Sequence, residues 1–310
     1  MKILITGAAG YIGSVLVPIL LQNDHEVIAI DNFMYKQTSL LDCCHYDNFT
    51  LINGDVRNSA LIEENMKKVD AILPLACLTG APLCDKDPIT AKAVNFEAIK
   101  TILEKRSSSQ MVIFPTTNSG YGVGEKGIHC TEETPLRPVS LYGQLKVEIE
   151  KMILDSGNSM TFRFATVFGV SPRMRLDLLV NDFTYRAYYD RFIVLFEAHF
   201  KRNYLHVRDA ARAFMYGLDN FENMKGEAYN VGLSDANISK AELCKVIKTE
   251  IPKFYFSEAE IGEDLDKRDY IVSNEKIEFA GFKTKHSLTY GIKELIKGFQ
   301  IVKKSGYGNI

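Results

Sequence analysis

Short apolar runs alternate with longer amphipathic segments through the first half of the chain. Four segments have the spacing of helices: Ile12–Asn23, Asn58–Lys68, Pro88–Arg106 and Leu141–Asp155. The runs between them are only a few residues long and rich in Ile, Val, Leu and Phe, as buried strands are. They are Lys2–Thr6, Glu26–Asp31, Thr50–Asn53, Ala71–Leu75, Met111–Thr116 and Met160–Ala165. Strands and helices that alternate over short connections predict an α/β fold with a doubly wound parallel sheet.

The pattern becomes less regular after Gly169. Helices are predicted at Asp177–Tyr189, Arg208–Leu218, Ser239–Glu250 and Ser287–Lys304, and strands at Phe192–Leu195, Tyr204–Val207 and Glu227–Val231. We expect residues 1–169 to form the sheet domain, with segments near 203–231 returning to it. Residues 170–310 then form mainly a smaller α/β domain that packs over the carboxyl edge of the sheet.

Charge and composition count against several classes of function. The chain has 37 Lys and Arg against 39 Asp and Glu, a formal net charge of −2, and no long basic block. We therefore expect no nucleic-acid partner. No apolar run approaches the ~20 residues of a membrane span, so we expect no membrane partner. Six cysteines without C-x-x-C spacing and six scattered histidines predict reduced thiols, a cytoplasmic location and no metal site.

A glycine-rich run, TGAAGYIG, spans Thr6–Gly13, where a predicted strand ends and a helix begins. Gly7 permits a tight turn, Gly10 lets the backbone approach a pyrophosphate, and Gly13 allows close helix–strand packing. Amide groups at the N-terminus of the following helix favour an anion. A turn that serves only packing could use the same glycines, so the motif alone leaves both interpretations open.

Asp31, at the end of the second predicted strand, supplies the acidic residue expected of a Rossmann-type dinucleotide site. It follows the glycines by about 20 residues, where a carboxylate binds a ribose 2′-hydroxyl. A carboxylate would repel a 2′-phosphate and no Arg occurs within Asn32–Tyr35, so we expect the cofactor NAD rather than NADP. Asp55 is either an acceptor for an adenine amino group or an N-cap or turn residue. The predicted NAD-binding residues of these segments are Gly7, Gly10, Tyr11, Ile12, Gly13, Asp31, Asn32, Asp55 and Val56.

Tyr142 and Lys146 are four positions apart in a predicted helix, so their side chains share one face. A cation beside a phenol lowers its pKa, which is about 10 when unperturbed. Such a phenol can take a proton from an alcohol near neutral pH. A Tyr and a Lys at this spacing also occur by chance in many helices; the adjacent dinucleotide site favours the catalytic interpretation.

Taken together, the motifs resemble those of extended short-chain dehydrogenases/reductases of the nucleotide-sugar epimerase/dehydratase group, nearly from end to end. The matching segments are TGAAGYIG (Thr6–Gly13), GDV (Gly54–Val56), PLAC (Pro74–Cys77), VN (Val94–Asn95), TTNSGYG (Thr116–Gly122), YGQLK (Tyr142–Lys146), FRFATVFG (Phe162–Gly169), RNYLHVRDAARA (Arg202–Ala213) and YNVG (Tyr229–Gly232). The resemblance implies a Rossmann-type sheet domain that binds NAD and a smaller domain, mainly residues 170–310, that binds a nucleotide sugar.

The resemblance also implies roles for individual residues. Tyr142 would be the base on a sugar hydroxyl, Lys146 would also hold the nicotinamide ribose, and Thr117 would hydrogen-bond the same sugar oxygen. Positions near the cofactor or the sugar are Leu75, Ala76, Asn95 and Arg163–Val167. The implied cofactor-binding residues of the later segments are Leu75, Ala76, Asn95, Tyr142, Lys146 and Val167. The implied substrate-binding residues are Asn118, Ser119, Thr166, Arg173, Asn181, Arg202 and Arg268.

Arg202 and Arg268 match late arginines that meet the ribose or diphosphate of the nucleotide, a role that suits the planar fork of Arg. The alternative for either is a solvated surface charge. One departure is informative: the 4,6-dehydratases of the group have Asp and Glu after the catalytic Thr, whereas this chain has Asn118 and Ser119. An amide and an alcohol are poor proton-transfer groups, so dehydration is disfavoured.

Two stretches, Ser171–Asp209 and Gly262–Asn274, are similar to bacterial GDP-heptose 4-dehydrogenases of surface-polysaccharide pathways. The resemblance implies NAD-dependent oxidation at C4 of a nucleotide sugar, with GDP-D-glycero-α-D-manno-heptose as the favoured substrate. A 4-epimerase with tightly held NAD would use the same three residues and stays open, as does a non-catalytic NAD-binding regulator.

The group also implies a homodimer or higher oligomer formed through the helices Pro88–Arg106 and Leu141–Asp155. Apolar residues on these helices could serve either the core or an interface; they are Ile89, Val94, Ile99, Ile102, Leu145, Ile149 and Met152.

Overall fold

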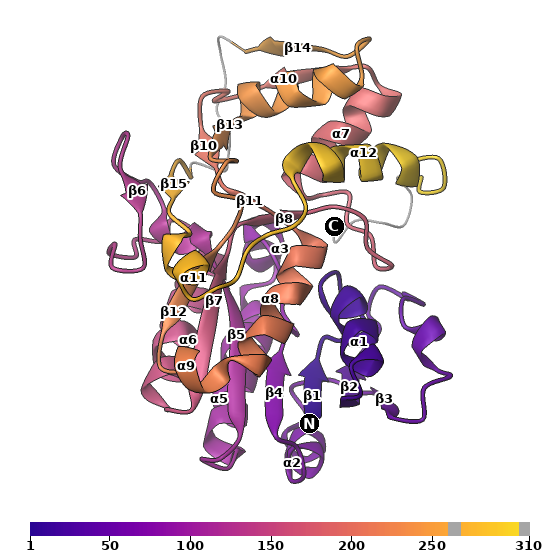
Figure 1. Ribbon diagram of the computed structural model, residues 1–310, viewed down its shortest axis with the longest axis vertical. Coiled ribbons are helices and arrows are strands. Elements are labelled where there is room, and N and C mark those ends of the chain that lie inside the picture. Colours follow the sequence, from indigo (N-terminus) through magenta and orange to yellow (C-terminus); the bar gives the residue numbers. More distant parts are fainter. Residues whose placement is uncertain (260–267, 304–310) are drawn as a thin grey trace.

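The computed structural model describes residues 1–259 and 268–303, and a seven-stranded parallel sheet lies at its centre (Figure 1). The strand order is β12-β7-β5-β4-β1-β2-β3. The strands are β1 (Lys2–Thr6), β2 (Glu26–Asp31), β3 (Phe49–Asn53), β4 (Ala71–Pro74), β5 (Met111–Thr117), β7 (Ser159–Phe164) and β12 (Ala228–Val231). The order reverses between β1 and β4, which is the switch point where doubly wound sheets bind ligands. The predicted fold class is confirmed.

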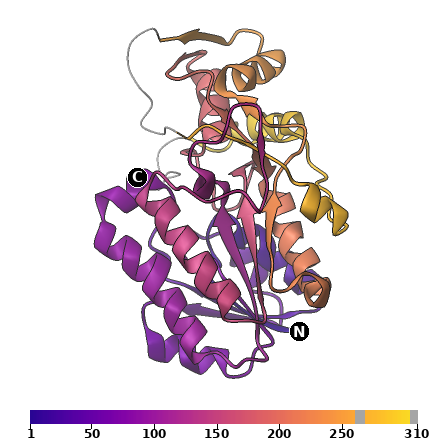
Figure 2. The ribbon, with the colours of Figure 1, turned by 90° about the vertical axis from the view of Figure 1, so that its left-hand side faces the viewer.

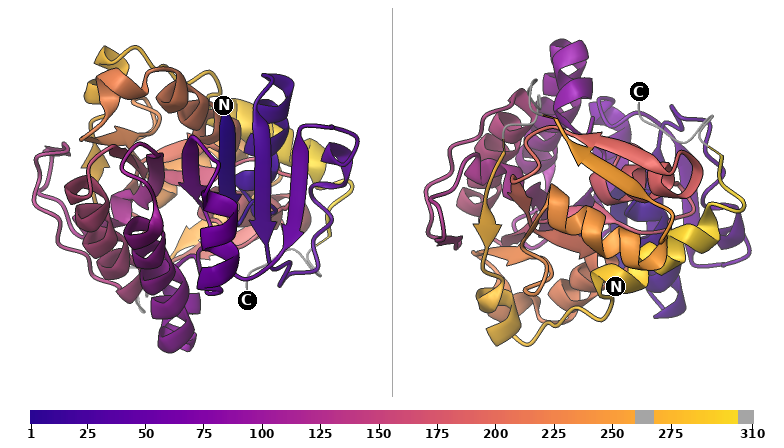
Figure 3. Two further views of the ribbon diagram at one scale, coloured as in Figure 1. Left: turned by 90° about the horizontal axis from the view of Figure 1, so that it is seen from below. Right: turned by 90° about the horizontal axis from the view of Figure 1, so that it is seen from above.

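Helices cover both faces of the sheet, as the alternation of strands and helices predicted (Figure 2 and Figure 3). On one face lie α1 (Gly13–Gln22) and α8 (Val207–Asp219). On the other lie α2 (Ser59–Met66), α5 (Ala98–Lys105) and α6 (Leu141–Asp155). Because both faces are covered, the central strands β1 and β7 are buried at nearly every position rather than at alternate ones.

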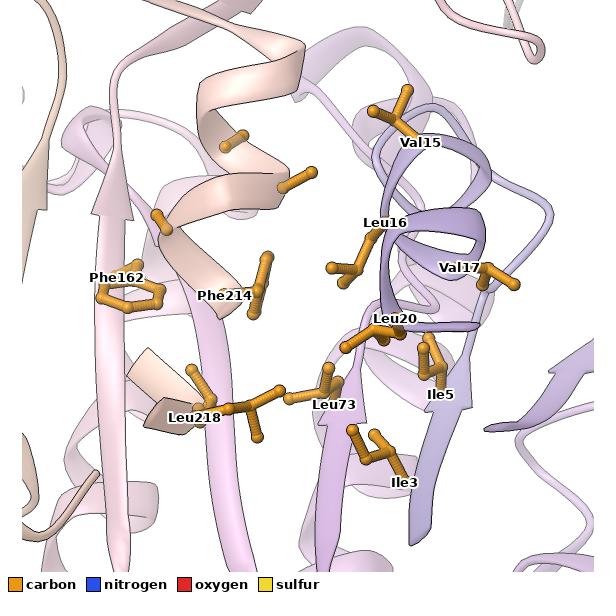
Figure 4. Packing of buried hydrophobic residues seen from close by; sticks show 14 of the residues in the cluster. Ile3, Ile5, Val15, Leu16, Val17, Leu20, Leu73, Phe162, Phe214 and Leu218 are labelled. Atoms are coloured by element: carbon orange, nitrogen blue, oxygen red, sulfur yellow. The ribbon is translucent and has the colours of Figure 1, made fainter. Parts of the chain in front are cut away.

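The core beneath α1 and α8 is closely packed (Figure 4). Phe214 on α8 contacts two rings of β7 edge to face, with centroids 5.7 Å from Phe162 and 5.6 Å from Phe164. Leu16 and Leu20 of α1 are fully buried in the same cluster. Burying each such side chain contributes about 1.5–3 kcal/mol to stability. This packing fixes the sheet edge from which the site residues project.

A second apolar core lies beyond the carboxyl ends of the strands (Figure 1 and Figure 3). It is built from α7 (Leu179–Tyr189), α10 (Lys240–Glu250), α12 (Leu288–Gly298) and the parallel pair β9 (Phe192–Leu195) and β14 (Tyr255–Glu258). The smaller C-terminal α/β unit was predicted and is present. Its boundary at residue 169 stays a prediction, although α8 and β12 belong to the sheet layer, as expected of the segments near 203–231.

Several short elements were not predicted, because each depends on a partner distant in the sequence. They are β8 (Thr166–Phe168), which pairs with the predicted strand β11 (Tyr204–His206), and the pairs β10 (Lys201–Arg202) with β13 (Ile238–Ser239) and β6 (His129–Cys130) with β15 (Ile271–Val272). The short helices are η1 (Leu41–Cys43), α3 (Ala81–Lys86), η3 (Asn118–Tyr121), α9 (Phe221–Met224) and α11 (Glu275–Phe279).

Two predicted helices differ in the structure. The segment predicted as one helix, Pro88–Arg106, consists of α4 (Pro88–Lys92), a π-helical turn η2 (Ala93–Glu97) and α5. The last helix was predicted to extend to Lys304 but ends at Gly298, where a Cβ atom would lie 3.1 Å from Val170 Cγ2. Lys304 lies outside the described residues. Within residues 1–259 and 268–303, no helix is long and apolar enough to cross a bilayer.

Candidate active site

A pocket opens at the carboxyl ends of the central strands. Loops after β1, β2, β3 and β4 form one part of its wall, and the end of β5, α6 and the segment 164–178 form another, with Arg268 and Tyr270 beside them. This is the switch point of the sheet. The predicted site residues that line it are Gly7, Gly10, Tyr11, Ile12, Gly13, Asp31, Asn32, Asp55, Val56, Leu75, Ala76, Thr117, Ser119, Tyr142, Lys146, Thr166, Val167, Arg173 and Arg268.

The glycine loop between β1 and α1 is tightly enclosed. Gly7 has φ +66°, and a Cβ atom there would lie 2.5 Å from the Ala76 nitrogen. Gly7 therefore forms the tight turn that the sequence predicted. At Gly13 a Cβ atom would lie 2.4 Å from the carbonyl oxygen of Ala8, so its close contact is with its own loop rather than with a strand. The amides of Ser14, Val15 and Leu16 already donate to the carbonyl oxygens of Gly10 and Ile12. The Ile12 and Gly13 amides, which have no backbone acceptor among the described residues, are the ones available to an anion.

Asp31 holds the glycine loop against the end of β2. Its Oδ2 accepts a hydrogen bond from the Ala9 amide at 3.0 Å, and its Oδ1 accepts one from the Phe33 amide at 2.8 Å. The carboxylate is largely buried yet lines the pocket, and burial raises its pKa above the ordinary value. These backbone contacts orient the carboxylate toward the pocket before any ligand binds.

Asp55 lines the pocket beside Asn32, but its carboxylate is engaged by Arg57. The Arg57 Nε and Nη2 atoms donate to its two oxygens, each at 2.8 Å, and this bidentate pair lowers the pKa of Asp55. The N-cap of α2 is Asn58, which leaves Asp55 as a turn residue at the pocket rim. Its second predicted role, as an acceptor for adenine, stays a prediction.

Tyr142 and Lys146 lie on the first two turns of α6, which Ser140 caps by accepting a hydrogen bond from the Gly143 amide at 3.2 Å. Lys146 is buried. Its Nζ donates to the carbonyl oxygen of Pro115 at 2.9 Å and lies 4.2 Å from the centroid of the Phe114 ring. The end of β5 therefore holds the ammonium group in one position within the pocket.

The expectation that Lys146 lowers the pKa of Tyr142 needs correction. In the structure the pKa of the Tyr142 hydroxyl is raised, chiefly by burial and further by the neighbouring thiols of Cys77 and Cys84. Arg175 and Arg268 act in the opposite direction. The reason is that the protein wall removes water from the phenol while Lys146 is directed to the Pro115 carbonyl. A lowered pKa would need positive charge from a ligand in the pocket.

Thr117 and Ser119 form a short hydrogen-bonded chain at the end of β5. Thr117 Oγ1 donates to Ser119 Oγ at 2.9 Å and accepts from the Ser119 amide at 3.1 Å. Arg268 Nη1 also hydrogen-bonds Ser119 Oγ. Because Ser119 Oγ accepts from both neighbours, its own proton is available to an acceptor in the pocket. The structure thus places Arg268 beside the predicted catalytic residues.

Four predicted site residues do not line the pocket. Asn95 hydrogen-bonds both backbone groups of Leu78, at 2.8 and 2.9 Å, and so supports a pocket loop from behind. Asn181 accepts from the Gly169 amide at 3.0 Å, and Arg202 lies against the Tyr270 ring. Asn118 is buried, and within the described residues neither of its amide atoms has a hydrogen-bond partner. The geometry therefore favours a supporting role for these four residues rather than direct contact with a ligand.

The segment Arg163–Val167 divides in a similar way. Thr166 and Val167 line the pocket, whereas Arg163 is turned to the other side of β7 and pairs with Glu150 of α6, with Nη2 2.7 Å from Oε1. Both side chains are buried. This ion pair joins β7 to α6 and stabilises the helix that presents Tyr142.

The pocket residues that the sequence interpretation missed include Tyr35, Cys77 and Arg175. The Arg173 guanidinium lies 4.4 Å from the centroid of the Tyr35 ring, and Arg175 pairs with Asp177. Position Arg175 was detectable in principle, because it follows Arg173 by two residues in the same loop. Cys77 closes the PLAC segment, and nothing in its spacing indicated that this residue would line the pocket.

These features fit NAD. A Cβ atom at Gly7 would collide with the Ala76 backbone, so the loop keeps its tight form only with glycine. The N-terminus of α1 suits a pyrophosphate, and the Asp31 carboxylate suits a ribose hydroxyl. Lys146, Tyr142 and Thr117 lie at the part of the pocket formed by β5 and α6, where the nicotinamide and a substrate would meet. In the described ranges, no group of three or more His, Cys, Asp or Glu residues could hold a metal ion.

Comparison with known proteins agrees with this geometry. Residues 3–232 match the pattern of the NAD dependent epimerase/dehydratase family. A Bacillus subtilis (strain 168) protein named "Uncharacterized UDP-glucose epimerase YtcB" is 30% identical over 281 residues, 85% of this chain and 87% of the relative.

Two solved structures have the same fold over nearly the whole chain. UDP-glucuronic acid 4-epimerase from Bacillus cereus, in complex with UDP-glucuronic acid and NAD, has a TM-score of 0.86 at 22% identity and covers 97% of this chain and 99% of its own. The dTDP-glucose 4,6-dehydratase from Bacillus anthracis, in complex with NAD, has a TM-score of 0.83 at 24% identity, with 97% and 96% covered. The resemblance seen in the sequence is confirmed: this chain belongs to the NAD dependent epimerase/dehydratase family.

Proposed function

We propose that this protein uses NAD to oxidise the C4 hydroxyl of a nucleotide-activated sugar to a ketone. The observation that supports the proposal is the meeting of Thr117, Tyr142 and Lys146 in the pocket that also holds the glycine loop and Asp31. A phenol and a hydroxyl at the same sugar oxygen can remove its proton as hydride leaves the carbon. NAD supplies the hydride acceptor when bound.

Each residue then has a defined task. Tyr142 takes the proton of the sugar hydroxyl, and Thr117 or Ser119 donates a hydrogen bond to the same oxygen. Lys146, held by the Pro115 carbonyl, positions the nicotinamide ribose and keeps a positive charge near the phenol. The raised pKa of Tyr142 makes this charge and that of the oxidised cofactor necessary for proton removal near neutral pH.

Dehydration after oxidation is disfavoured on this account. Elimination of water needs an acid and a base beside the sugar, and this chain offers Asn118 and Ser119 at the corresponding positions. Asn118 does not line the pocket, and Ser119 Oγ already accepts hydrogen bonds from Thr117 and Arg268. The reaction therefore ends at the 4-keto sugar or returns from it.

We propose GDP-D-glycero-α-D-manno-heptose as the sugar to be tested first, which places the enzyme in the biosynthesis of bacterial capsule or surface-polysaccharide sugars. This choice rests on the resemblance of Ser171–Asp209 and Gly262–Asn274 to GDP-heptose 4-dehydrogenases. The first stretch contributes Arg173 and Arg175 to the pocket, which suits a diphosphate. Of the second stretch, residues 262–267 lie outside the described residues.

The second candidate is a nucleotide-sugar 4-epimerase. The names of relatives favour it, since these include UDP-glucose 4-epimerases and a UDP-glucuronic acid 4-epimerase. An epimerase would perform the same oxidation, rotate the keto sugar and return the hydride to the opposite face. The discriminating observation is whether reduced cofactor accumulates.

A donor panel tests both candidates. Purified protein and NAD are mixed with GDP-heptose, GDP-mannose, and UDP- and dTDP-hexoses, while nicotinamide reduction is followed by absorbance and products by NMR. A keto sugar with matching NADH supports the dehydrogenase, and an inverted sugar without net NADH supports the epimerase. Cofactor binding without turnover of any donor would instead support a non-catalytic NAD-binding protein.

Tyr142→Phe is the matched test of mechanism. We expect turnover of the accepted donor to fall by roughly 10²–10⁴-fold, the contribution of a positioned acid–base group, while NAD stays bound. Tyr290→Phe, at an exposed tyrosine of α12, should leave turnover unchanged. Full turnover by Tyr142→Phe would show that the proposed base is wrong.

A further inference from the structure

Two cysteine thiols lie side by side next to the catalytic residues. Cys77 Sγ is 3.4 Å from the carbonyl oxygen of Leu78, and Cys84 Sγ is 3.2 Å from the same oxygen. Asn95 Nδ2 donates to this oxygen at 2.9 Å and lies 3.6 Å from Cys84 Sγ. One carbonyl therefore gathers both thiols, and the buried Asn95 amide holds that carbonyl in place.

The two thiols differ in their access to the pocket. Cys77 lines it, whereas Cys84 lies on α3 and is fully buried behind the pocket loop. Burial raises the pKa of the Cys77 thiol, and the nearby Lys146 ammonium acts in the opposite direction. A small reagent that enters the pocket would therefore meet Cys77 first, with Cys84 as the thiol behind it.

We propose that Cys77 and Cys84 form a redox-active dithiol, and that its oxidation to a disulfide blocks the NAD pocket. A hydroperoxide first oxidises the Cys77 thiol to a sulfenic acid and is itself reduced to water or an alcohol. The Cys84 thiol then attacks the sulfenic sulfur, which forms the S–S bond and releases water. A dithiol reductant reverses the change by thiol–disulfide exchange.

The disulfide requires the loop between the cysteines to adjust. A disulfide needs Cβ atoms about 3.8 Å apart. Gly80 stands between the two cysteines at φ +96°, and a glycine backbone can adjust more readily than any other. The bond would draw Cys77 away from Lys146 and shift the segment from Leu75 to Gly80, which lines the pocket. Loss of NAD binding is the expected consequence.

Peptide mass tests the proposal without reference to any sugar substrate. The intact protein, with and without NAD, is exposed to hydrogen peroxide, alkylated and digested with trypsin. Lys68 and Lys86 flank both cysteines, so they fall on one peptide, Val69–Lys86. We expect this peptide to become lighter by two hydrogen atoms, to resist alkylation, and to recover after dithiothreitol. Bound NAD should slow the change by covering Cys77.

The exposed Cys44 reports whether the oxidant acted. If Cys44 is oxidised while the peptide Val69–Lys86 carries two alkylated thiols, the proposal is overturned. Cys84→Ser should abolish the disulfide and leave the Cys77 sulfenic acid open to oxidation by a second peroxide to a sulfinic acid, which dithiothreitol does not reduce. Cys244→Ser, a buried cysteine of the C-terminal core, should form the disulfide as the wild type does. Should either variant fold poorly, the wild-type mass measurement still decides the question, and it does so independently of the proposed C4 oxidation.

Discussion

The carboxylate of Asp31 accepts backbone hydrogen bonds on both oxygen atoms at the end of β2. The Ala9 and Phe33 amides compensate part of the cost of burying it beside the glycine loop. A carboxylate oriented in this way loses little freedom when a ribose binds, because its position is already fixed. The same charge would repel the 2′-phosphate of NADP, as the sequence predicted.

Asp31→Asn should therefore weaken NAD binding and reduce the discrimination against NADP. A hydrogen bond to a charged group contributes about 1.5–3 kcal/mol, so we expect the Kd for NAD to rise by roughly 10–100-fold. Titration calorimetry with both cofactors measures the change. Asp55→Asn, whose carboxylate is engaged by Arg57, should have the smaller effect. Unchanged NAD affinity in Asp31→Asn would contradict the assigned role.

At this scale, sequence spacing identified the residues that act through backbone geometry or helical periodicity. The glycine loop, Asp31, Tyr142 and Lys146 all line one pocket, while their roles in binding and catalysis stay predictions. The partners of these side chains were not predictable, because contacts such as Lys146 with the Pro115 carbonyl join positions far apart in the chain. For the same reason, the sequence did not reveal that Asn118 and Asn95 face away from the pocket.

Among the elements, α12 is fixed to the sheet layer through Glu294. Its Oε2 accepts from the Val170 amide at 3.0 Å and lies 2.9 Å from His206 Nε2, and its Oε1 lies 3.2 Å from Arg208 Nε. Burial opposes ionisation, but these contacts outweigh it and lower the pKa of Glu294 from 4.5 to about 2. The ionised carboxylate thus joins α12 to α8 and to the segment after β8.

This depressed pKa predicts acid lability. Because the folded-state pKa lies below the unfolded one, the stabilisation is complete above about pH 4.5 and is lost as pH falls toward 2. The loss amounts to at most about 3 kcal/mol, taking 1.36 kcal/mol per unit. Glu294→Gln should lower the free energy of unfolding by about 1–3 kcal/mol at neutral pH and flatten its dependence on pH in this window.

Urea unfolding at several pH values provides the measurement. Glu250→Gln is the matched control. The Glu250 carboxylate of α10 also pairs with a residue of α12, with Oε1 3.6 Å from Lys293 Nζ near the surface. A near-surface pair contributes little, so this variant should stay within about 0.5 kcal/mol of the wild type. Equal pH dependence in Glu294→Gln and the wild type would refute the assigned contact.

Element prediction succeeded where the pattern was local and repeated. The sheet strands and the helices that cover them were predicted with small errors at their ends. The π-helical turn at Ala93–Glu97 was not, because it depends on the packing that buries Val94, Asn95 and Phe96 in succession. Apart from β11, the short strands of two or three residues were missed because so few residues carry no periodicity.

For the whole molecule, the structure separates core residues from a possible subunit interface. Of the apolar residues that could serve either role, Val94, Ile99, Ile102, Leu145 and Ile149 are buried in the sheet core. Ile89 on α4 remains 84% exposed. A large apolar side chain left exposed on a predicted interface helix is the residue expected to contact a second copy.

We therefore predict a homodimer in which Ile89 is buried. Light scattering should give about twice the chain mass of 34.9 kDa, and Ile89→Glu should shift the population toward the monomer. Phe279→Glu, at another exposed apolar residue, is the control and should leave the mass unchanged. A wild-type monomer at working concentration would refute the prediction.

The central claim is that hydride leaves C4 of a nucleotide sugar within this pocket. A donor deuterated at C4 tests it most directly, by mass spectrometry of the nicotinamide and of the sugar after reaction with NAD. The account predicts deuterium on the reduced nicotinamide, or, for an epimerase, deuterium returned to C4 of the inverted sugar. Complete exchange of the label into water, or turnover in which C4 keeps its deuterium in an uninverted configuration, would contradict it.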